Sequence, residues 1–410
     1  MTIARIALTF ICCAAVCQAQ PTVVGQKIAE PLVLDGQLDE PVWQQAMWHT
    51  GFTLLGAVET LAEAQTHFAV AFDDSHLYIG VRCDEPRMDE LKADETERDG
   101  KVHRDDCIEF MIDSTGDRTE YYHLTTTPGA TLYDAQLRQG GHVRASQWDC
   151  DWQAAVARGE DQWTVEVAVP FVELGLTDAS AGDWALNVTR ERKAGKAELS
   201  SFTTAPGGFH QPTFYAQLQL PEAGLERFMW TMREPFDELV RTDGEEIVYT
   251  AKTHLTNHTG RMWLLELRPE LIAGDTTSTG ETVTLGLDDG QGREVSFSVP
   301  VREQGAQVLR LTVVDRRDPE RVLYLRSIPI TAEYTPIAID MVEPWYRNSI
   351  YATQQVDEVE LIVSLALAEE QLAGRRVSAM ILAPTDDGRG KPVAVGTPVP
   401  AADEVRLSIP

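Results

Sequence analysis

The chain has 410 residues, of which 43% are hydrophobic, and 64 acidic against 35 basic side chains give it a net charge of -29. This length allows two to four domains, and the hydrophobic content excludes general disorder. The negative charge argues against nucleic acid and anionic membranes as partners, since basic surfaces recognise both. A neutral ligand fits this charge, but so does an acidic surface with no ligand at all.

The first 19 residues have the features of a secretory signal peptide. Arg5 supplies a positive charge, residues 6–17 form an apolar run too short to span a membrane, and residues 17–19 place an alanine before the expected cleavage. We therefore expect the mature chain to begin at Gln20 and to be exported to the periplasm or the cell exterior. A lipoprotein anchored through Cys17 is less favoured, because the preceding residues lack the usual leucine. No later apolar run is long enough for a transmembrane helix.

From residue 34 onward, short strands alternate with turns. The sequence LDGQLDEPVW at residues 34–43 predicts a turn, then a short helical turn that carries Trp43 inward. Alternating apolar residues predict strands at residues 67–72, 77–83, 105–113, 121–127, 132–137, 152–156, 163–169, 184–188 and 214–220. Helical periodicity is nearly absent, so residues 20–222 are predicted to form a β-sandwich.

The segment DDCIEFMID at residues 105–113 is the centre of this predicted domain. Ile108, Phe110 and Ile112 fall on one face of the strand, which can be buried against a second sheet. Glu109 falls on the other face, where it must be hydrated or paired, because burying an unpaired charge is costly. The strand therefore predicts the floor of a small-ligand site. Asp113 shares this face but stands ~13 Å from Glu109, beyond the ~5 to 10 Å that separates the carboxylates of a glycosidase.

Two further β domains are predicted after the first. Residues 223–334 contain strand-like segments separated by turns, as expected of an immunoglobulin-like sandwich. Residues 335–410 hold fewer strand candidates than the about seven that such a sandwich usually needs. We therefore expect the third domain to be incomplete and the chain to be a fragment of a longer protein, since a missing strand exposes an apolar edge. A small complete domain that closes on its neighbour is the alternative.

Several segments of the first domain resemble the family 9 carbohydrate-binding modules. They are DGQLDEPVW at 35–43, AFDDSHLYIGVRC at 71–83, DDCIEFMID at 105–113, the tyrosines at 121 and 122, TVEVAVPFVELGL at 164–176, WALNVTRER at 184–192 and FHQPTFYAQLQL at 209–220. The resemblance extends over about half of the chain. It implies a jelly-roll-like sandwich, related to DOMON domains, that binds sugar without cleaving it and is often attached to a glycoside hydrolase.

The resemblance also implies ligand-binding residues. Glu109 matches the family's ligand-binding carboxylate, and His123 lies where members carry a polar or basic residue. The two aromatic clamp positions, tryptophans in well-studied members, fall at His103 and Phe209, and Trp148 is a candidate substitute platform. The predicted partner is a carbohydrate, either a mono- or oligosaccharide or the end of a polysaccharide.

Two other functions stay open. The chain could be a structural or adhesive protein of the cell envelope without a sugar site, or a DOMON-like haem protein for electron transfer, with Met111 and His123 as axial ligands. No catalytic motif is recognised, so any glycoside hydrolase activity is expected in a missing or associated domain. No cofactor is required, although acidic turns such as Asp73-Asp74 would allow a calcium ion.

Three cysteines remain after the predicted cleavage, Cys83, Cys107 and Cys150, and their spacing does not suggest zinc. The family resemblance places Cys83 and Cys107 at the end and the start of two strands in one sandwich. Antiparallel pairing of these strands would bring the two thiols within bridging distance. We therefore predict a Cys83–Cys107 disulfide, with Cys150 as the odd thiol.

Overall fold

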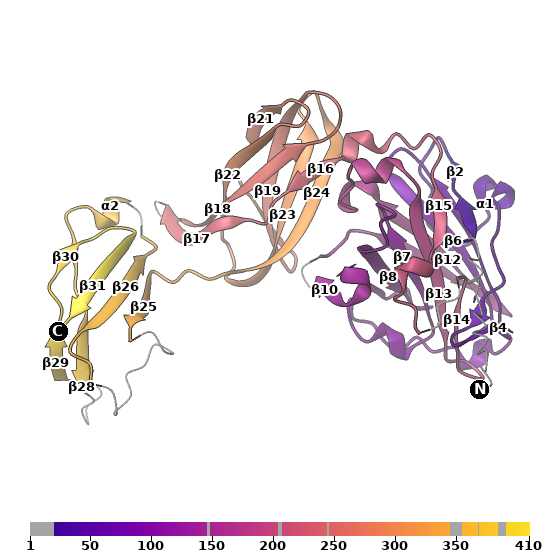
Figure 1. Ribbon diagram of the computed structural model, residues 1–410, viewed down its shortest axis with the longest axis horizontal. Coiled ribbons are helices and arrows are strands. Elements are labelled where there is room, and N and C mark those ends of the chain that lie inside the picture. Colours follow the sequence, from indigo (N-terminus) through magenta and orange to yellow (C-terminus); the bar gives the residue numbers. More distant parts are fainter. Residues whose placement is uncertain are drawn as a thin grey trace, which may run out of the picture. The chain divides into compact units, whose positions relative to one another are not determined.

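The structure is a computed structural model that describes residues 20–145, 148–203, 207–243, 246–344, 355–367, 369–383 and 391–410. The predicted signal peptide and the lipoprotein cysteine lie outside the described residues. Packing divides the chain into two compact units: residues 20–144, 153–168 and 182–223 form the first, and residues 145–152, 169–181 and 224–410 form the second. Nearly all regular structure is β-strand, which confirms the all-β prediction (Figure 1).

The first unit is a β-sandwich of two sheets. The larger sheet has the order β10-β9-β8-β7-β13-β14-β3-β4, with β15 beside β13 and β1 beside β15. Its strands are β1 (Thr22–Val24), β3 (Thr53–Leu54), β4 (Ala57–Leu61), β7 (Cys107–Asp113), β8 (Tyr121–Thr126), β9 (Leu132–Arg138), β10 (Val143–Ala145), β13 (Trp184–Arg192), β14 (Glu198–Ser201) and β15 (Ala216–Gln219). The smaller sheet, β11-β12-β6-β5-β2, contains β2 (Gln26–Lys27), β5 (Thr66–Phe72), β6 (His76–Asp84), β11 (Gln153–Arg158) and β12 (Gln162–Pro170).

Strand β7 has the apolar face that its sequence predicts. Ile108, Phe110 and Ile112 have no exposed surface, and Phe68 of β5 in the other sheet is equally buried. Side chains of alternate residues therefore fill the space between the two sheets, as in other sandwiches. The opposite face of β7 is also covered, because Glu109 and its neighbours on that face are buried as well.

A buried carboxylate organises the start of the sandwich. The short helix α1 (Pro41–Gln45) carries Trp43 inward as predicted, and its indole N–H donates to Oε1 of Glu166 at 2.8 Å. The other oxygen of Glu166 accepts hydrogen bonds from the backbone N–H groups of Asp35 and Gly36. Gly36 has φ of +82°, and a Cβ there would lie 2.6 Å from backbone atoms of β11. Glycine is thus required at this turn.

The predicted disulfide is wrong. Cys83, Cys107 and Cys150 are all free and buried. The prediction assumed that the strands of Cys83 and Cys107 pair with each other, but β6 and β7 belong to opposite sheets. Cys83 instead lies opposite Thr66, and Cys107 opposite Glu191. Burial raises the pKa of the Cys83 thiol to about 11, as expected for an inert structural cysteine.

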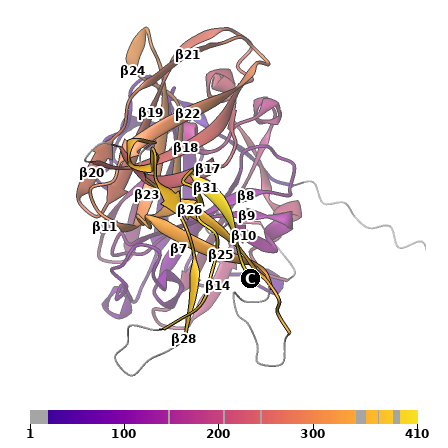
Figure 2. The same cartoon turned by 90° about the vertical axis from the view of Figure 1, so that its left-hand side faces the viewer.

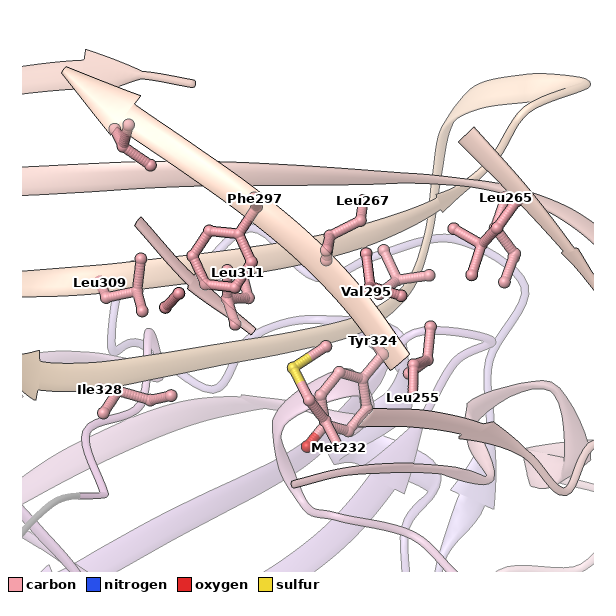
Figure 3. Close-up of a cluster of buried hydrophobic side chains, with 14 of the residues drawn as sticks. Met232, Leu255, Leu265, Leu267, Val295, Phe297, Leu309, Leu311, Tyr324 and Ile328 are labelled. Atoms are coloured by element: carbon pink, nitrogen blue, oxygen red, sulfur yellow. The ribbon is translucent and has the colours of Figure 1, made fainter. Parts of the chain in front are cut away.

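The second unit contains a sandwich of two sheets between residues 230 and 332. One sheet joins β16 (Trp230–Met232), β17 (Phe236–Asp243), β18 (Glu246–Asn257) and β22 (Gly292–Pro300); the other joins β19 (Trp263–Ala273), β20 (Thr276–Thr279), β21 (Val283–Leu287), β23 (Gly305–Asp315) and β24 (Asp318–Ala332). Buried and partly exposed residues alternate along β19 from Trp263 to Ile272. Figure 3 shows the result, an apolar layer that includes Leu265, Phe297 and Leu311.

The last part of the chain forms three small sheets. Strands β25, β26 and β31 run side by side in both views (Figure 1, Figure 2). The elements are β25 (Ile337–Glu343), β26 (Val359–Leu365), α2 (Glu369–Leu372), β27 (Arg376–Val377), β28 (Met380–Ala383), β29 (Lys391–Val395), β30 (Val399–Pro400) and β31 (Glu404–Ile409). In the described residues, no helix is long and apolar enough to cross a membrane.

Two short segments that lie before residue 182 pack within the second unit. The ring of Phe171 lies 6.0 Å from that of Phe228, and Arg310 pairs with Asp151 at 2.8 Å. Both oxygens of Glu173 accept the backbone N–H of Asp151. Burial, together with the negative charge of Asp151, raises the pKa of Glu173 to about 8. These contacts join residues 145–152 and 169–181 to the second sandwich.

Candidate functional site

Glu109 and His123 meet on the face of β7 and β8 that points away from the space between the sheets. Met111 lies opposite His123 in the ladder, and Glu109 lies opposite Thr125. His123 Nε2 is 2.6 Å from Oε2 of Glu109, and the Thr125 hydroxyl lies 3.2 Å from the same nitrogen. Glu109 is 5% exposed and His123 is 8% exposed. The mid-strand carboxylate is therefore paired, one of the two outcomes that the sequence allows.

Electrostatics keep Glu109 ionised. Burial by itself would raise the pKa of Glu109, but the hydrogen bond and charge of His123, with smaller contributions from His210 and Thr189, hold that pKa below its usual range. The second carboxylate oxygen, Oε1, is buried and has no hydrogen-bond partner among the described residues. Buried polar atoms nearly always have a partner, and the hydroxyl of Thr189, directly opposite on β13, is the protein donor that acts on this carboxylate. A carboxylate oxygen has two lone pairs, so Oε1 can accept a further hydrogen bond from a ligand.

Aromatic rings surround His123 on the outer side of the pair. The rings of Tyr133 and His210 both meet it edge-on, with centroids at 5.5 Å and 5.0 Å. Nδ1 of His210 lies 2.8 Å from the hydroxyl of Tyr121. Desolvation and the neighbouring His123 lower the pKa of His210, and Glu109 opposes this shift. His210 is exposed and Tyr133 is partly exposed, so these two residues form the side of the site that reaches solvent.

Glu109 also belongs to a polar row that crosses the sheet. The row is defined by residues that stand opposite one another on successive strands: Tyr133, Thr125, Glu109, Thr189, Ser201 and Thr53. Directly opposite residues point to the same face of a sheet. The buried hydroxyls of Thr189 and Thr53, like Oε1 of Glu109, have no hydrogen-bond partner among the described residues. Three buried polar atoms of one row thus lack a hydrogen bond of good geometry, which is unusual in a protein interior.

The structure places the other predicted residues differently. Phe209 is 8% exposed and packs in an apolar cluster with Met111 and Tyr215, whose hydroxyl donates to the Phe209 carbonyl at 3.0 Å. His103 is exposed in a 3-10 turn (Val102–Arg104) and makes none of the contacts that hold Glu109 and His123. Trp148 belongs to the second unit, where its indole N–H donates to the carbonyl of Glu173 at 3.3 Å.

Sequence reasoning missed three residues around the pair, Tyr133, Arg144 and Thr189, and it favoured a loop histidine without a role for a fourth, His210. Tyr133 could have been predicted from strand alternation, because it stands opposite Thr125 on the next strand and points to the same face of the sheet. Thr189 required knowledge that β13 pairs with β7, which joins segments distant in sequence. His210 and Arg144 reach the site from a loop and from a short edge strand, and neither position has a periodic signal.

Two groups of acidic residues are candidate cation sites, and their geometry differs. At the Asp73-Asp74 turn, both oxygens of Asp73 already accept hydrogen bonds, from Ser75, His76 and the hydroxyl of Tyr78. This turn is therefore a poor calcium site. The carboxylates of Asp35, Glu40 and Glu166 do lie within 4.8 Å of one another. Burial and the nearby Glu166 raise the pKa of Glu40 to about 7, so a shared proton also accounts for this group.

Met111 and His123 do not form a ready pair of haem ligands. The side chain of Met111 is fully buried in the apolar cluster with Phe209. Nε2 of His123 is engaged by Glu109 and Thr125. Binding iron through this nitrogen would break the hydrogen bond that stabilises the buried carboxylate. The residues present therefore do not fit haem ligation.

Comparison with known proteins identifies relatives of the first part of the chain. Residues 34–223 match the sequence model of a family described as carbohydrate family 9 binding domain-like. The chain is also similar to the exoglucanase XynX of Acetivibrio thermocellus, with 22% identity over 179 residues, which is 43% of this chain and 15% of that protein. The chain thus spans a small part of the length of this relative.

Two solved structures also match. One is a family 9 carbohydrate-binding module from Caldicellulosiruptor kristjanssonii in complex with glucose; it is 13% identical, with a TM-score of 0.37, and covers 48% of this chain and 95% of that chain. The other is a putative carbohydrate-binding protein from Bacteroides uniformis; it is 14% identical, with a TM-score of 0.41, and covers 49% of this chain and 100% of that chain.

Proposed function

Residues 34–223 form a family 9 carbohydrate-binding-like domain, and from this premise we propose that the polar face around Glu109 and His123 binds a sugar. The chain itself binds without cleaving, and it is exported. Export rests on the signal-like sequence of residues 1–19. An association with glycoside hydrolysis rests on the similarity to an exoglucanase over a small part of that enzyme.

The observation that carries the proposal is the state of Glu109. This carboxylate is buried, and its pKa is held below the usual range; one oxygen is held by His123, and the other makes no hydrogen bond of good geometry, although the hydroxyl of Thr189 acts on the carboxylate. Sugar hydroxyls are neutral donors of suitable size, and a carboxylate accepts hydrogen bonds that are stronger than those between neutral groups. The rings of Tyr133 and His210 at the solvent side add apolar faces against which the C–H groups of a sugar can pack.

The absence of cleavage is proposed because the next carboxylate on the strand is committed to structure. The two oxygens of Asp113 accept backbone N–H groups of Thr115, Gly116 and Arg118, which close the turn after β7. A glycosidase needs a second free carboxyl group across the bond that it cleaves. Asp113 is neither free nor placed for that role, so Glu109 is assigned to binding.

Calorimetric titration of the full chain with glucose, cellobiose and cellotriose, extended to a panel of other neutral and acidic sugars, tests the proposal. Glu109→Gln keeps the size of the side chain but removes the charge, and we expect it to weaken sugar binding at least tenfold. Glu160→Gln, at an exposed residue between β11 and β12, is the matched control and should bind like the wild type. Wild-type protein that binds no sugar of the panel would refute the proposal.

A further inference from the structure

Arg144 is the charged group at the solvent side of the proposed sugar site. It lies on β10, the edge strand next to β9, and its guanidinium carbon is 4.8 Å from the centroid of the Tyr133 ring. Tyr133 contacts His123, which in turn binds Glu109, so one ring connects Arg144 to the floor of the site. Stacking on an aromatic face fixes the plane of a guanidinium and leaves the N–H groups at its edge available for a ligand.

The hydrogen-bond partners of nearby arginines set Arg144 apart. Arg98 binds Asp134 of β9 at 2.5 Å, and Arg138 lies 3.9 Å from Glu120. Arg144 is exposed, and its guanidinium has no carboxylate or carbonyl partner among the described residues. With a net charge of -29, the chain as a whole repels anions. An unpaired cation beside the ligand site is therefore the feature that would let an anion bind there.

Of the three carboxylates that act on the Tyr133 ring, Glu109 and Asp134 have a basic partner and Asp99 does not. Glu109 is paired with His123, and Asp134 is paired with Arg98. Asp99, the remaining acidic residue that acts on the Tyr133 ring, accepts the backbone N–H of Asp134 at 3.2 Å. Planar guanidinium groups bind carboxylates through two parallel hydrogen bonds, which adds geometric selectivity to the charge.

Resting on the proposed sugar site, we propose that its ligand is an acidic sugar, a hexuronic acid residue whose carboxylate binds Arg144 while its ring hydroxyls bind Glu109 and His123. Arg144 is then the residue that selects acidic over neutral sugars. The polar row that contains Glu109 can bind the hydroxyl groups of acidic and neutral sugars alike. Selection between the two kinds of sugar therefore depends on Arg144, at the solvent side of the site. A charge-assisted hydrogen bond at this position should favour the acidic sugar roughly tenfold.

Matched ligands test the inference directly. Methyl glucuronide and methyl glucoside differ only in the carboxylate at C6, as do methyl galacturonide and methyl galactoside. The full chain is titrated with each of the four ligands, as the wild type, as Arg144→Gln and as Arg138→Gln, an exposed arginine of β9 that serves as the control. We expect one uronide to bind roughly tenfold more tightly than its neutral counterpart, and this preference to vanish only in Arg144→Gln. Added salt should weaken uronide binding and leave glycoside binding unchanged.

The outcomes separate the two proposals. If a neutral glycoside binds as well as its uronide and Arg144→Gln changes neither, the acidic-sugar inference is overturned and the sugar site stands. If none of the four ligands binds and cellotriose and the wider panel also fail, the site itself is refuted and this inference falls with it. A preference for the uronide that survives in Arg144→Gln would also overturn the role of Arg144.

Discussion

The two sandwiches of this chain treat buried charge in opposite ways. The first buries Glu85, Glu109, Arg190 and Arg192 almost completely, together with further acidic side chains. Among the described residues between 224 and 334, Asp315 is the only charged side chain buried to that degree. Strands such as β19 in the second sandwich alternate between buried and partly exposed residues, whereas β7 in the first is buried on both faces.

This difference indicates different tasks. A sandwich with one apolar face per sheet is stabilised by burial alone and needs no further partner. A sandwich that buries charged groups must give each of them hydrogen-bond partners. A buried polar atom that lacks a hydrogen bond of good geometry, such as Oε1 of Glu109, marks a place where a ligand can bind. We therefore expect the second sandwich to act as a scaffold and the first to carry the ligand site.

The largest expected effect concerns the buried network of Glu85. Its carboxylate accepts hydrogen bonds from Arg190 at 3.0 Å and from Arg192 at 2.7 Å and 2.8 Å. Glu85→Gln leaves Arg190 buried without a counter-ion and Arg192 with only Glu198, 3.7 Å away, so we expect it to lower the free energy of unfolding by about 3 to 5 kcal/mol. The control is Glu266→Gln in the second sandwich, whose pair with Arg268 is partly exposed and should contribute less than about 1 kcal/mol. Equal losses in urea unfolding would contradict the contrast.

An apolar deletion should damage only the scaffold. Leu311 of β23 is fully buried among the residues in Figure 3, so Leu311→Ala should cost roughly 2 to 5 kcal/mol through lost burial and a cavity. We expect the calorimetric transition of the second sandwich to move to lower temperature while sugar affinity is unchanged. Leu239→Ala, at an exposed position of β17, should move it little. Loss of sugar binding in Leu311→Ala would break the separation of tasks.

Glu173 should make the second unit sensitive to pH. Its pKa is raised to about 8 in the folded chain, above the usual value for an unfolded carboxyl group, so the folded state binds more protons. Stability should then be greatest below about pH 4.5 for this group and should fall by roughly 3 to 4 kcal/mol between pH 5 and pH 8. Glu173→Gln should remove most of this slope in unfolding curves recorded between pH 5 and pH 8. An unchanged slope would show that other groups cause it.

The smallest effect compares two buried hydroxyls. Thr253 in the second sandwich donates to the carbonyl of Arg233 at 2.7 Å, so Thr253→Val should cost about 1 kcal/mol. Thr189 in the polar row makes no hydrogen bond of good geometry, although its hydroxyl acts on Glu109, so Thr189→Val should change stability by less than about 0.5 kcal/mol or increase it. Denaturant titration of both variants decides the point. A loss in Thr189→Val as large as that in Thr253→Val would mean that the row is built for stability.

The sequence predicted where the strands lie better than it predicted which strands pair with one another. Alternation within β7 located Glu109 on the face opposite Ile108, and the structure confirms that placement. Pairing between distant strands leaves no local trace, so the contact of β7 with β13, and with it Thr189, could not be predicted. The same gap produced the wrong disulfide, because the apolar strands of Cys83 and Cys107 look alike whichever sheet they join.

The exposed strand β17 shows another limit of pattern reading. Its residues are mostly exposed, so its sequence lacks the apolar alternation that predicts a strand. It is a strand because it pairs with β18. Around the site, family resemblance indicated Glu109 and His123, which meet at 2.6 Å. It could not supply Arg144 or His210, because short edge strands and loops vary most where binding specificity is set.

The packing of residues 145–152 and 169–181 with the second sandwich bears on how such a chain can evolve. A recombination event between residues 223 and 224 would separate Phe171 from Phe228 and Asp151 from Arg310. A first sandwich transferred by such an event would carry Phe171 without Phe228, the ring that packs against it. Inheritance as a single piece is therefore favoured, and exchange between genes should preserve this joint rather than cut through it.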